Sequence, residues 1–96
     1  MRTSFLVCYD IADPKRLRRV FKTCKNFGTP VQFSVFECDL NPSERQQLES
    51  DLRDIINHAN DQVLFVVLGP SEGRGSRVVT ALGRPYSKFD EPCYVV

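Results

Sequence analysis

An aspartate at the end of an apolar run is the residue of this chain best placed for chemistry. Residues Phe5 to Tyr9 are all apolar or aromatic, which is typical of a strand buried on both faces, and the run ends on Asp10. Asp13 and Pro14 then have the residue types of a helix N-cap and of the first helical position. An exposed carboxylate between a strand and a helix can hold a metal ion or face a reacting phosphate. The alternative is a turn aspartate that only accepts hydrogen bonds from loop amides.

A basic helix is expected directly after this aspartate. Apolar residues recur at helical spacing from Leu17 to Phe27, and Gly28 is the expected stop. Arg16 falls at the edge of the apolar stripe, where its guanidinium can emerge beside the helix start. The opposite face carries only cations, which are Lys15, Arg18, Arg19, Lys22 and Lys25. Because no acid is present to form i,i+4 pairs, this face is either a solvated surface or a site for an anionic partner.

Charge is distributed unevenly along the chain. Residues 1–36 carry seven Lys or Arg against two Asp or Glu, whereas residues 37–61 carry two against seven. The net charge of +1 therefore hides a strongly positive first third. That part of the chain is where an anionic partner would bind.

Composition and cysteine spacing exclude several classes of protein. With 42% apolar and 26% charged residues, the chain resembles an ordinary globular protein, and it has no apolar run long enough to cross a bilayer. The four cysteines are widely spaced and form no C-x-x-C pair, so they are expected to be reduced residues of a cytoplasmic protein. The one histidine, His58, is expected near the terminal carbonyls of a helix. A zinc site is therefore not expected.

Residues 29–40 are β-prone but long for a single strand. A kink, a bulge or a very tight hairpin is expected around residues 33–35. Ser34 and Phe36 would then face the same way. The alternative is that Phe36 is a core residue and Ser34 a turn hydroxyl.

A second helix and a second apolar strand are expected next. The helix begins with Asn41 and Pro42 and is expected to run to about His58, with an acidic exposed face. Residues 62–68 form another uninterrupted apolar strand, and residues 93–96 form an apolar, β-prone tail.

This order of elements predicts a single α+β domain over residues 1–96. The expected architecture is a ferredoxin-like βαββαβ sandwich with an extra C-terminal strand, with a core of about residues 1–69 and a loop and tail of about residues 70–96. Both helices would cover one face of the sheet. Because the strands are apolar on both faces, a second copy of the chain is the simplest cover for the other face, which predicts a homodimer.

Two groups of residues carry a family resemblance. The chain contains Tyr9-Asp10-Ile11, Asp13 and Arg16, followed by Gly28-x-x-Val31-Gln32-x-Ser34-Val35-Phe36-Glu37-Cys38. This combination, in fewer than a hundred residues, resembles the CRISPR-associated "Cas two" family, the small partners in the spacer-acquisition module of prokaryotic adaptive immunity. The match covers residues 5–40 well and residues 61–68 loosely.

The resemblance implies a ferredoxin-like homodimer with C-terminal strand exchange. It also implies a nuclease on RNA or double-stranded DNA, and a subunit that bridges two dimers of the CRISPR integrase. It places the family's metal-binding aspartate on Asp10, its preceding tyrosine on Tyr9 and a helix-start arginine on Arg16. The family's strand serine and phenylalanine fall on Ser34 and Phe36.

The sequence departs from the family at three positions. A basic residue is common just before the Val-Gln pair, where this chain has Pro30. An arginine and a tyrosine are frequent in the later strand, where this chain has Leu64 and Val66. These departures concern residues expected to contact phosphate and leave Asp10 untouched.

The leading hypothesis is a Mg²⁺-dependent endonuclease in which Asp10 and its symmetry mate share one ion, for which Mn²⁺ can substitute. The catalytic candidates are Asp10, Tyr9 and Ser34. The nucleic-acid-binding candidates are Arg16, Arg18, Arg19, Lys22 and Phe36.

Two alternatives stand beside this hypothesis. The first is a dimeric scaffold that binds duplex DNA on its basic helices, without turnover, and presents it to the integrase. The second is a ferredoxin-like module that binds a small metabolite, which only the glycines of residues 69–76 support.

Overall fold

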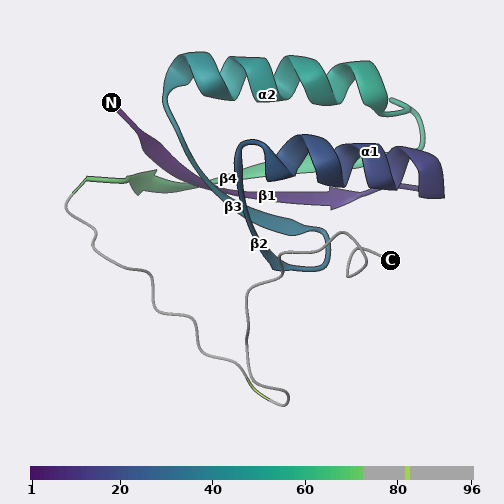
Figure 1. The fold of residues 1–96 in the computed structure, drawn as a ribbon, viewed down its shortest axis with the longest axis horizontal. Helices are drawn as coiled ribbons and strands as arrows, with labels where there is room; N and C mark the ends of the chain where they lie inside the picture. Colours follow the sequence, from purple (N-terminus) through teal and green to yellow (C-terminus); the bar gives the residue numbers. More distant parts are fainter. Residues whose placement is uncertain (73–81, 83–96) are drawn as a thin grey trace.

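Two helices lie on one side of a four-stranded sheet (Figure 1). The computed structural model describes residues 1–72 and Leu82. The elements are β1 (Thr3–Asp10), α1 (Pro14–Lys25), β2 (Gly28–Gln32), β3 (Val35–Leu40), α2 (Pro42–Ile55) and β4 (Gln62–Pro70). This order confirms the predicted βαββαβ arrangement. The predicted loop and apolar tail after residue 72, including the tail at residues 93–96, lie outside the described residues.

The strand order is β2-β3-β1-β4, and each neighbouring pair is antiparallel. β1 is therefore an inner strand, paired with β3 on one side and with β4 on the other. Its backbone is hydrogen-bonded on both sides, which holds the end of β1 in place. No helix of the described residues is long and apolar enough to cross a membrane.

Both helices begin where their capping residues predict. Asp13 accepts a hydrogen bond from the Arg16 amide at 2.9 Å, and Pro14 occupies the first turn of α1. Asn41 and Glu44 form a reciprocal capping box at the start of α2, with distances of 2.7 and 2.9 Å. These caps satisfy amides that have no partner inside the helix.

The helix ends differ from the predicted ones. α1 ends at Lys25, and Gly28 is the first residue of β2 instead of the helix stop. The physical reason for glycine there is close packing, because a Cβ at Gly28 would lie 2.5 Å from the Sγ of Cys38. α2 ends at Ile55, before the predicted end near His58. His58 does contact a terminal carbonyl as predicted, with its Nε2 3.2 Å from the oxygen of Arg53.

The hydrophobic core fills the space between the helices and the sheet. Alternate residues of β1, beginning with Phe5, point into this core. The largest fully buried side chains are Phe36, Leu48, Val7, Val20, Cys24 and Cys38. Among the strands, β1 and β3 supply the buried apolar side chains of this core, whereas β4 contributes only partly buried ones.

A two-residue turn separates β2 from β3 at Phe33 and Ser34. Ser34 has a φ of 64°, in the left-handed region, and the register of the two strands shifts between Pro30 and Gln32. The expected tight hairpin is therefore confirmed, with an irregularity in β2 beside it. Ser34 lies in the turn itself, as the turn-hydroxyl alternative describes.

The side of the sheet away from the helices carries apolar residues of β1 and β4. Cys8 pairs with Leu64 and Leu6 pairs with Val66 across these two strands. The side chains of Leu64 and Val66 are 49% and 42% exposed. The homodimer is predicted because the strands are apolar on both faces, and this is the face that the helices do not cover.

Candidate functional site

Asp10 is the last residue of β1, and its side chain is exposed. Across the sheet it pairs with Gln62 at the start of β4. On the other side of β1, the Tyr9 amide donates a hydrogen bond of 3.0 Å to the Ser34 carbonyl in the β2–β3 turn. The structure thus places the carboxylate at the rigid end of an inner strand, with Ser34 in the neighbouring turn. This is the position that the sequence predicts.

Tyr9 points to the opposite side of the sheet. Its ring is buried and stacks on Phe36, with centroids 6.3 Å apart. Its hydroxyl has no hydrogen-bond partner within the described residues. Burial, with a smaller contribution from Cys24, raises the pKa of this hydroxyl well above its ordinary range. The phenol therefore stays protonated and lies away from the Asp10 side.

Phe36 is fully buried between Tyr9 and Phe21, whose ring centroid is 5.4 Å away. A ring that stacks on a base must have an exposed face. The ring of Phe36 has no exposed face, so Phe36 is a core residue, as the alternative reading of the sequence describes.

Arg16 forms an ion pair that sequence reasoning did not foresee. Its Nε lies 2.7 Å from Oδ2 of Asp61, and its Nη2 lies 3.2 Å from Oδ1. The two residues are 45 positions apart, and no spacing pattern connects them. The only signal was the position of Asp61 directly before β4, the strand that pairs with β1. Arg16 therefore forms an ion pair within the protein, whereas the sequence predicts that it binds nucleic acid.

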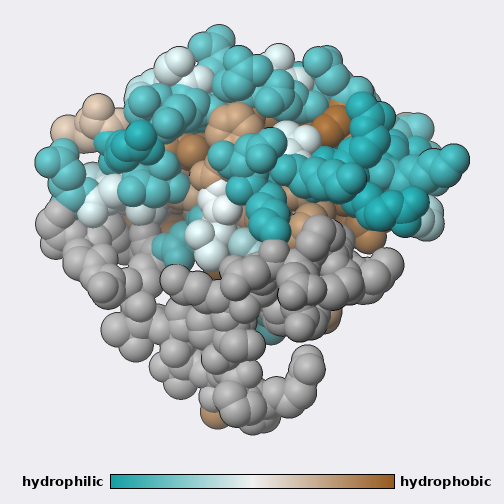
Figure 2. Space-filling view, in the orientation of Figure 1, coloured by the Kyte–Doolittle hydropathy of each residue, from teal (hydrophilic) through white to brown (hydrophobic). Residues whose placement is uncertain are grey.

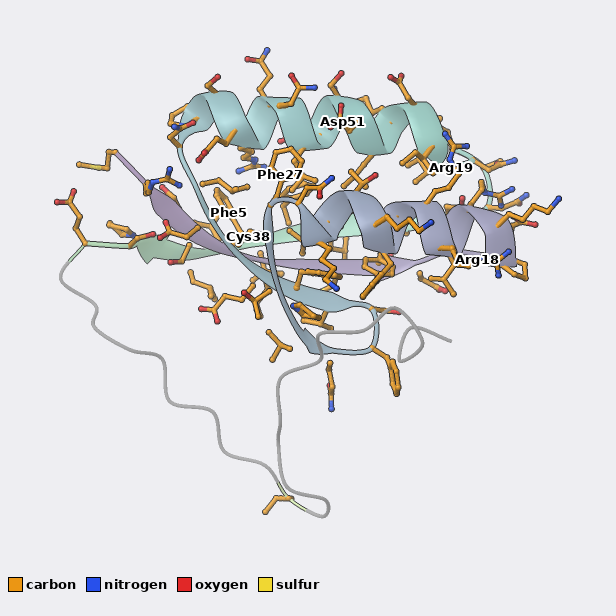
Figure 3. The ribbon with its side chains drawn as sticks, in the orientation of Figure 1. Phe5, Arg18, Arg19, Phe27, Cys38 and Asp51 are labelled. Atoms are coloured by element: carbon orange, nitrogen blue, oxygen red, sulfur yellow. The ribbon has the colours of Figure 1, made fainter. Side chains whose placement is uncertain are left out.

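The remaining cations of α1 are exposed. No ion pair of Arg18, Arg19 or Lys22 is found among residues 1–72. Arg18 and Arg19 lie in the second turn of α1, toward the end of the molecule at which β1 ends (Figure 3). Strongly hydrophilic side chains gather at this end of the surface (Figure 2). Arg18, Arg19 and Lys22 thus form a basic face that has no ion pair to the described part of the chain.

The donor set can be compared with the needs of a metal ion. Within the described residues, no three His, Cys, Asp or Glu side chains come together. Asp10 supplies one exposed carboxylate, and Mg²⁺ is commonly held by one or two carboxylates with water and phosphate as the other ligands. Asp10 therefore fits as one carboxylate ligand of a hydrated Mg²⁺ ion. The described residues of one chain do not supply a complete set of protein ligands.

The buried thiols offer neither a nucleophile nor a ligand. Burial, together with the neighbouring Cys38, raises the pKa of Cys24 to about 12, and burial raises that of Cys38 to about 11. A thiol must lose its proton to act in either role. Both cysteines are core residues, as the sequence predicts.

One pocket among the described residues lies apart from the predicted site. An open pocket of about 250 Å³ lies between α2 and β4, and Leu52, Val63 and Phe65 form part of its wall. None of the predicted site residues lines it. The metabolite-binding alternative depends on the glycines of residues 69–76, and residues 73–76 lie outside the described part of the chain.

The fold and the site together define a class of protein. It is a small α+β domain with an exposed carboxylate at the end of its first strand and the exposed cations Arg18, Arg19 and Lys22 on the helix that follows. The model of the family described as CRISPR associated protein Cas2 matches residues 1–73. The chain belongs to the Cas2 family.

Curated relatives agree with this assignment. A protein of Rhodospirillum rubrum named CRISPR-associated endoribonuclease Cas2 1 is 40% identical, over 97% of this chain and 90% of its own length. One of Geobacter sulfurreducens named CRISPR-associated endoribonuclease Cas2 is 38% identical over the full length of both chains. The crystal structure of Streptococcus pyogenes Cas2 at pH 6.5 superposes with a TM-score of 0.67 and 36% identity, over 80% of this chain and 99% of that one.

Proposed function

We propose that this chain is a Mg²⁺-dependent endonuclease that hydrolyses phosphodiester bonds of RNA or double-stranded DNA during CRISPR spacer acquisition. The observation that carries the proposal is the exposed carboxylate of Asp10 at the end of an inner strand, on a chain whose following helix carries the exposed cations Arg18, Arg19 and Lys22, with no ion pair to the described residues. The names of the relatives from Rhodospirillum rubrum and Geobacter sulfurreducens support a ribonuclease activity.

A homodimer supplies the second carboxylate. The half-exposed Leu64 and Val66 provide apolar surface for a second copy of the chain. If the two-fold axis relating the copies passes close to the end of β1, the two Asp10 side chains would meet at one site. When bound there, Mg²⁺ would neutralise phosphate charge and activate water.

The roles of the other residues follow from their positions. Arg18, Arg19 and Lys22 would bind phosphates along the nucleic-acid backbone. Ser34, in the turn beside the end of β1, would help to orient substrate. Tyr9 would act through the packing that holds β1, because its hydroxyl faces the core.

The second candidate is a scaffold role, and the uncompensated basic face favours it. A dimer could bind duplex DNA across two such faces and present it to the CRISPR integrase without cleaving it. Binding of this kind is independent of sequence and weakens steeply with salt. Both roles can reside in one protein.

One experiment separates the two candidates by comparing Asp10→Ala with the double variant Arg18→Glu and Arg19→Glu. Labelled RNA and DNA duplexes are incubated with each variant, with Mg²⁺, with Mn²⁺ or with EDTA. We expect Asp10→Ala to abolish cleavage and to keep duplex binding. The double variant should bind more weakly, with a slope of log affinity against log salt smaller by roughly two.

Matched controls are available on the exposed side of α2. Asp54→Ala removes a carboxylate and Arg53→Glu reverses a charge, and neither residue lies on the α1 face. Wild-type cleavage by pure Asp10→Ala would exclude the nuclease. Spacer acquisition that survives Asp10→Ala but fails in the double variant would establish the scaffold in its place.

A further inference from the structure

The carboxylate of Asp61 accepts four hydrogen bonds. Its Oδ1 accepts from the Ala12 amide at 2.9 Å and from Nη2 of Arg16 at 3.2 Å. Its Oδ2 accepts from Nε of Arg16 at 2.7 Å and from the Asn57 amide at 2.8 Å. The side chain of Asp61 has no exposed surface, and that of Arg16 is 25% exposed. Both oxygens are therefore used by the protein itself.

These four bonds join three segments of the chain. Ala12 lies in the loop that follows Asp10, Arg16 lies in the first turn of α1, and Asn57 lies between α2 and β4. Asp61 itself directly precedes Gln62, the residue paired with Asp10 across the sheet. The cluster thus holds the backbone next to Asp10 from two directions, along the chain and across the sheet.

The pair also changes what Arg16 can do. Arg16 presents Nε and Nη2 to one carboxylate, a bidentate geometry that lysine cannot reproduce. Its charge is neutralised by Asp61 at 2.7 Å, so it adds little to the field of the exposed α1 cations. Arg18 and Arg19 differ in this respect, because the described residues offer them no such acid.

We propose that Asp61 and Arg16 are positioning residues that fix the loop after Asp10, and that Arg16 affects cleavage through Asp61 and not by contact with phosphate. This inference rests on the proposed function of Asp10. Mg²⁺ requires near-ideal octahedral geometry, so two carboxylates that share an ion must be placed accurately. A loop held by four hydrogen bonds gives that accuracy before substrate arrives.

Asp61→Asn tests the pair with almost no change of shape. It removes the charge and replaces one acceptor with a donor, so the bonds to Ala12 and Arg16 cannot all be kept. We expect kcat to fall by roughly 100-fold, the loss that a displacement of about 1 Å can produce. We expect KM and the duplex affinity of the metal-free variant to stay unchanged.

A second measurement needs neither metal nor activity. Hydrogen exchange of the Ala12 amide, followed by NMR in the metal-free protein, should be faster in Asp61→Asn and in Arg16→Ala than in the wild type. The matched control is Arg18→Ala, which should weaken duplex binding and leave this exchange rate unchanged. Arg16→Lys should show the defect of Arg16→Ala in kcat, because it keeps the charge but not the bidentate contact.

The proposal is overturned if Asp61→Asn keeps both the wild-type kcat and the wild-type exchange rate of Ala12. It is also overturned if Arg16→Ala weakens duplex binding as Arg18→Ala does while kcat stays unchanged. If Asp61→Asn does not fold, the same readouts on Arg16→Lys decide the question. Failure of the nuclease itself is recognised separately, because Asp10→Ala would then cleave like the wild type while the exchange of Ala12 still reports on the pair.

Discussion

At the scale of single residues, Asp10 and Tyr9 show how strand geometry separates neighbours in sequence. Successive side chains of a strand point to opposite faces. Asp10 is accordingly exposed, whereas Tyr9 is buried among the helix-facing residues. Two residues that stand together in the family pattern are therefore suited to different tasks, one to chemistry and the other to packing.

Replacement of Tyr9 by phenylalanine separates these tasks. The buried hydroxyl has no partner within the described residues, so its removal leaves no broken hydrogen bond behind. We expect the free energy of unfolding in urea to stay the same or to rise by up to about 1 kcal/mol. Cleavage should match that of the wild type.

Tyr9→Ala is the matched control, because it removes the ring as well. It should cost about 3–5 kcal/mol through the cavity that it leaves. A large loss of cleavage in a stable Tyr9→Phe variant would instead give the hydroxyl a direct part in the reaction.

At the scale of elements, local signals predicted much of the fold. The caps at Asp13 and Asn41 mark the starts of α1 and α2, and the long β-prone stretch indicates the hairpin that turns at Ser34. These features depend on residues close together in sequence. The Arg16–Asp61 pair and the burial of the Tyr9 hydroxyl depend on contacts between distant segments, which no local pattern encodes.

Gly28 illustrates the same limit. Its position after a helical pattern suggested a helix stop, but the structure requires glycine for the packing of β2 against β3. A Cβ there would lie 2.5 Å from both the Sγ of Cys38 and the carbonyl oxygen of Glu37. One of these neighbours belongs to the backbone, so it cannot move aside cheaply.

Gly28→Ala is therefore expected to destabilise the protein. The loss should be roughly 1–3 kcal/mol, the usual cost of forcing extra atoms into a packed site. Urea unfolding measures it, with Thr29→Ala at the next, exposed position of the same strand as the control. An equal stability of wild type and Gly28→Ala would show that β2 and β3 can separate at no cost.

At the scale of the whole molecule, the proposed site requires two copies of the chain. A single chain offers Asp10 as its exposed carboxylate at the site, and the described residues contain no cluster of three metal ligands. The half-exposed Leu64 and Val66 provide the surface on which a second copy would supply the missing group. The proposed chemistry therefore depends on a shared site between two chains.

The stoichiometry of metal binding tests this dependence most directly. Calorimetric titration of the protein with Mn²⁺, with the assembly state measured by sedimentation, gives the number of ions per chain. We expect a dimer that binds one ion per two chains, and no binding at this site in Asp10→Ala. A monomer, one ion for each chain, or binding that is unchanged in Asp10→Ala would contradict this expectation.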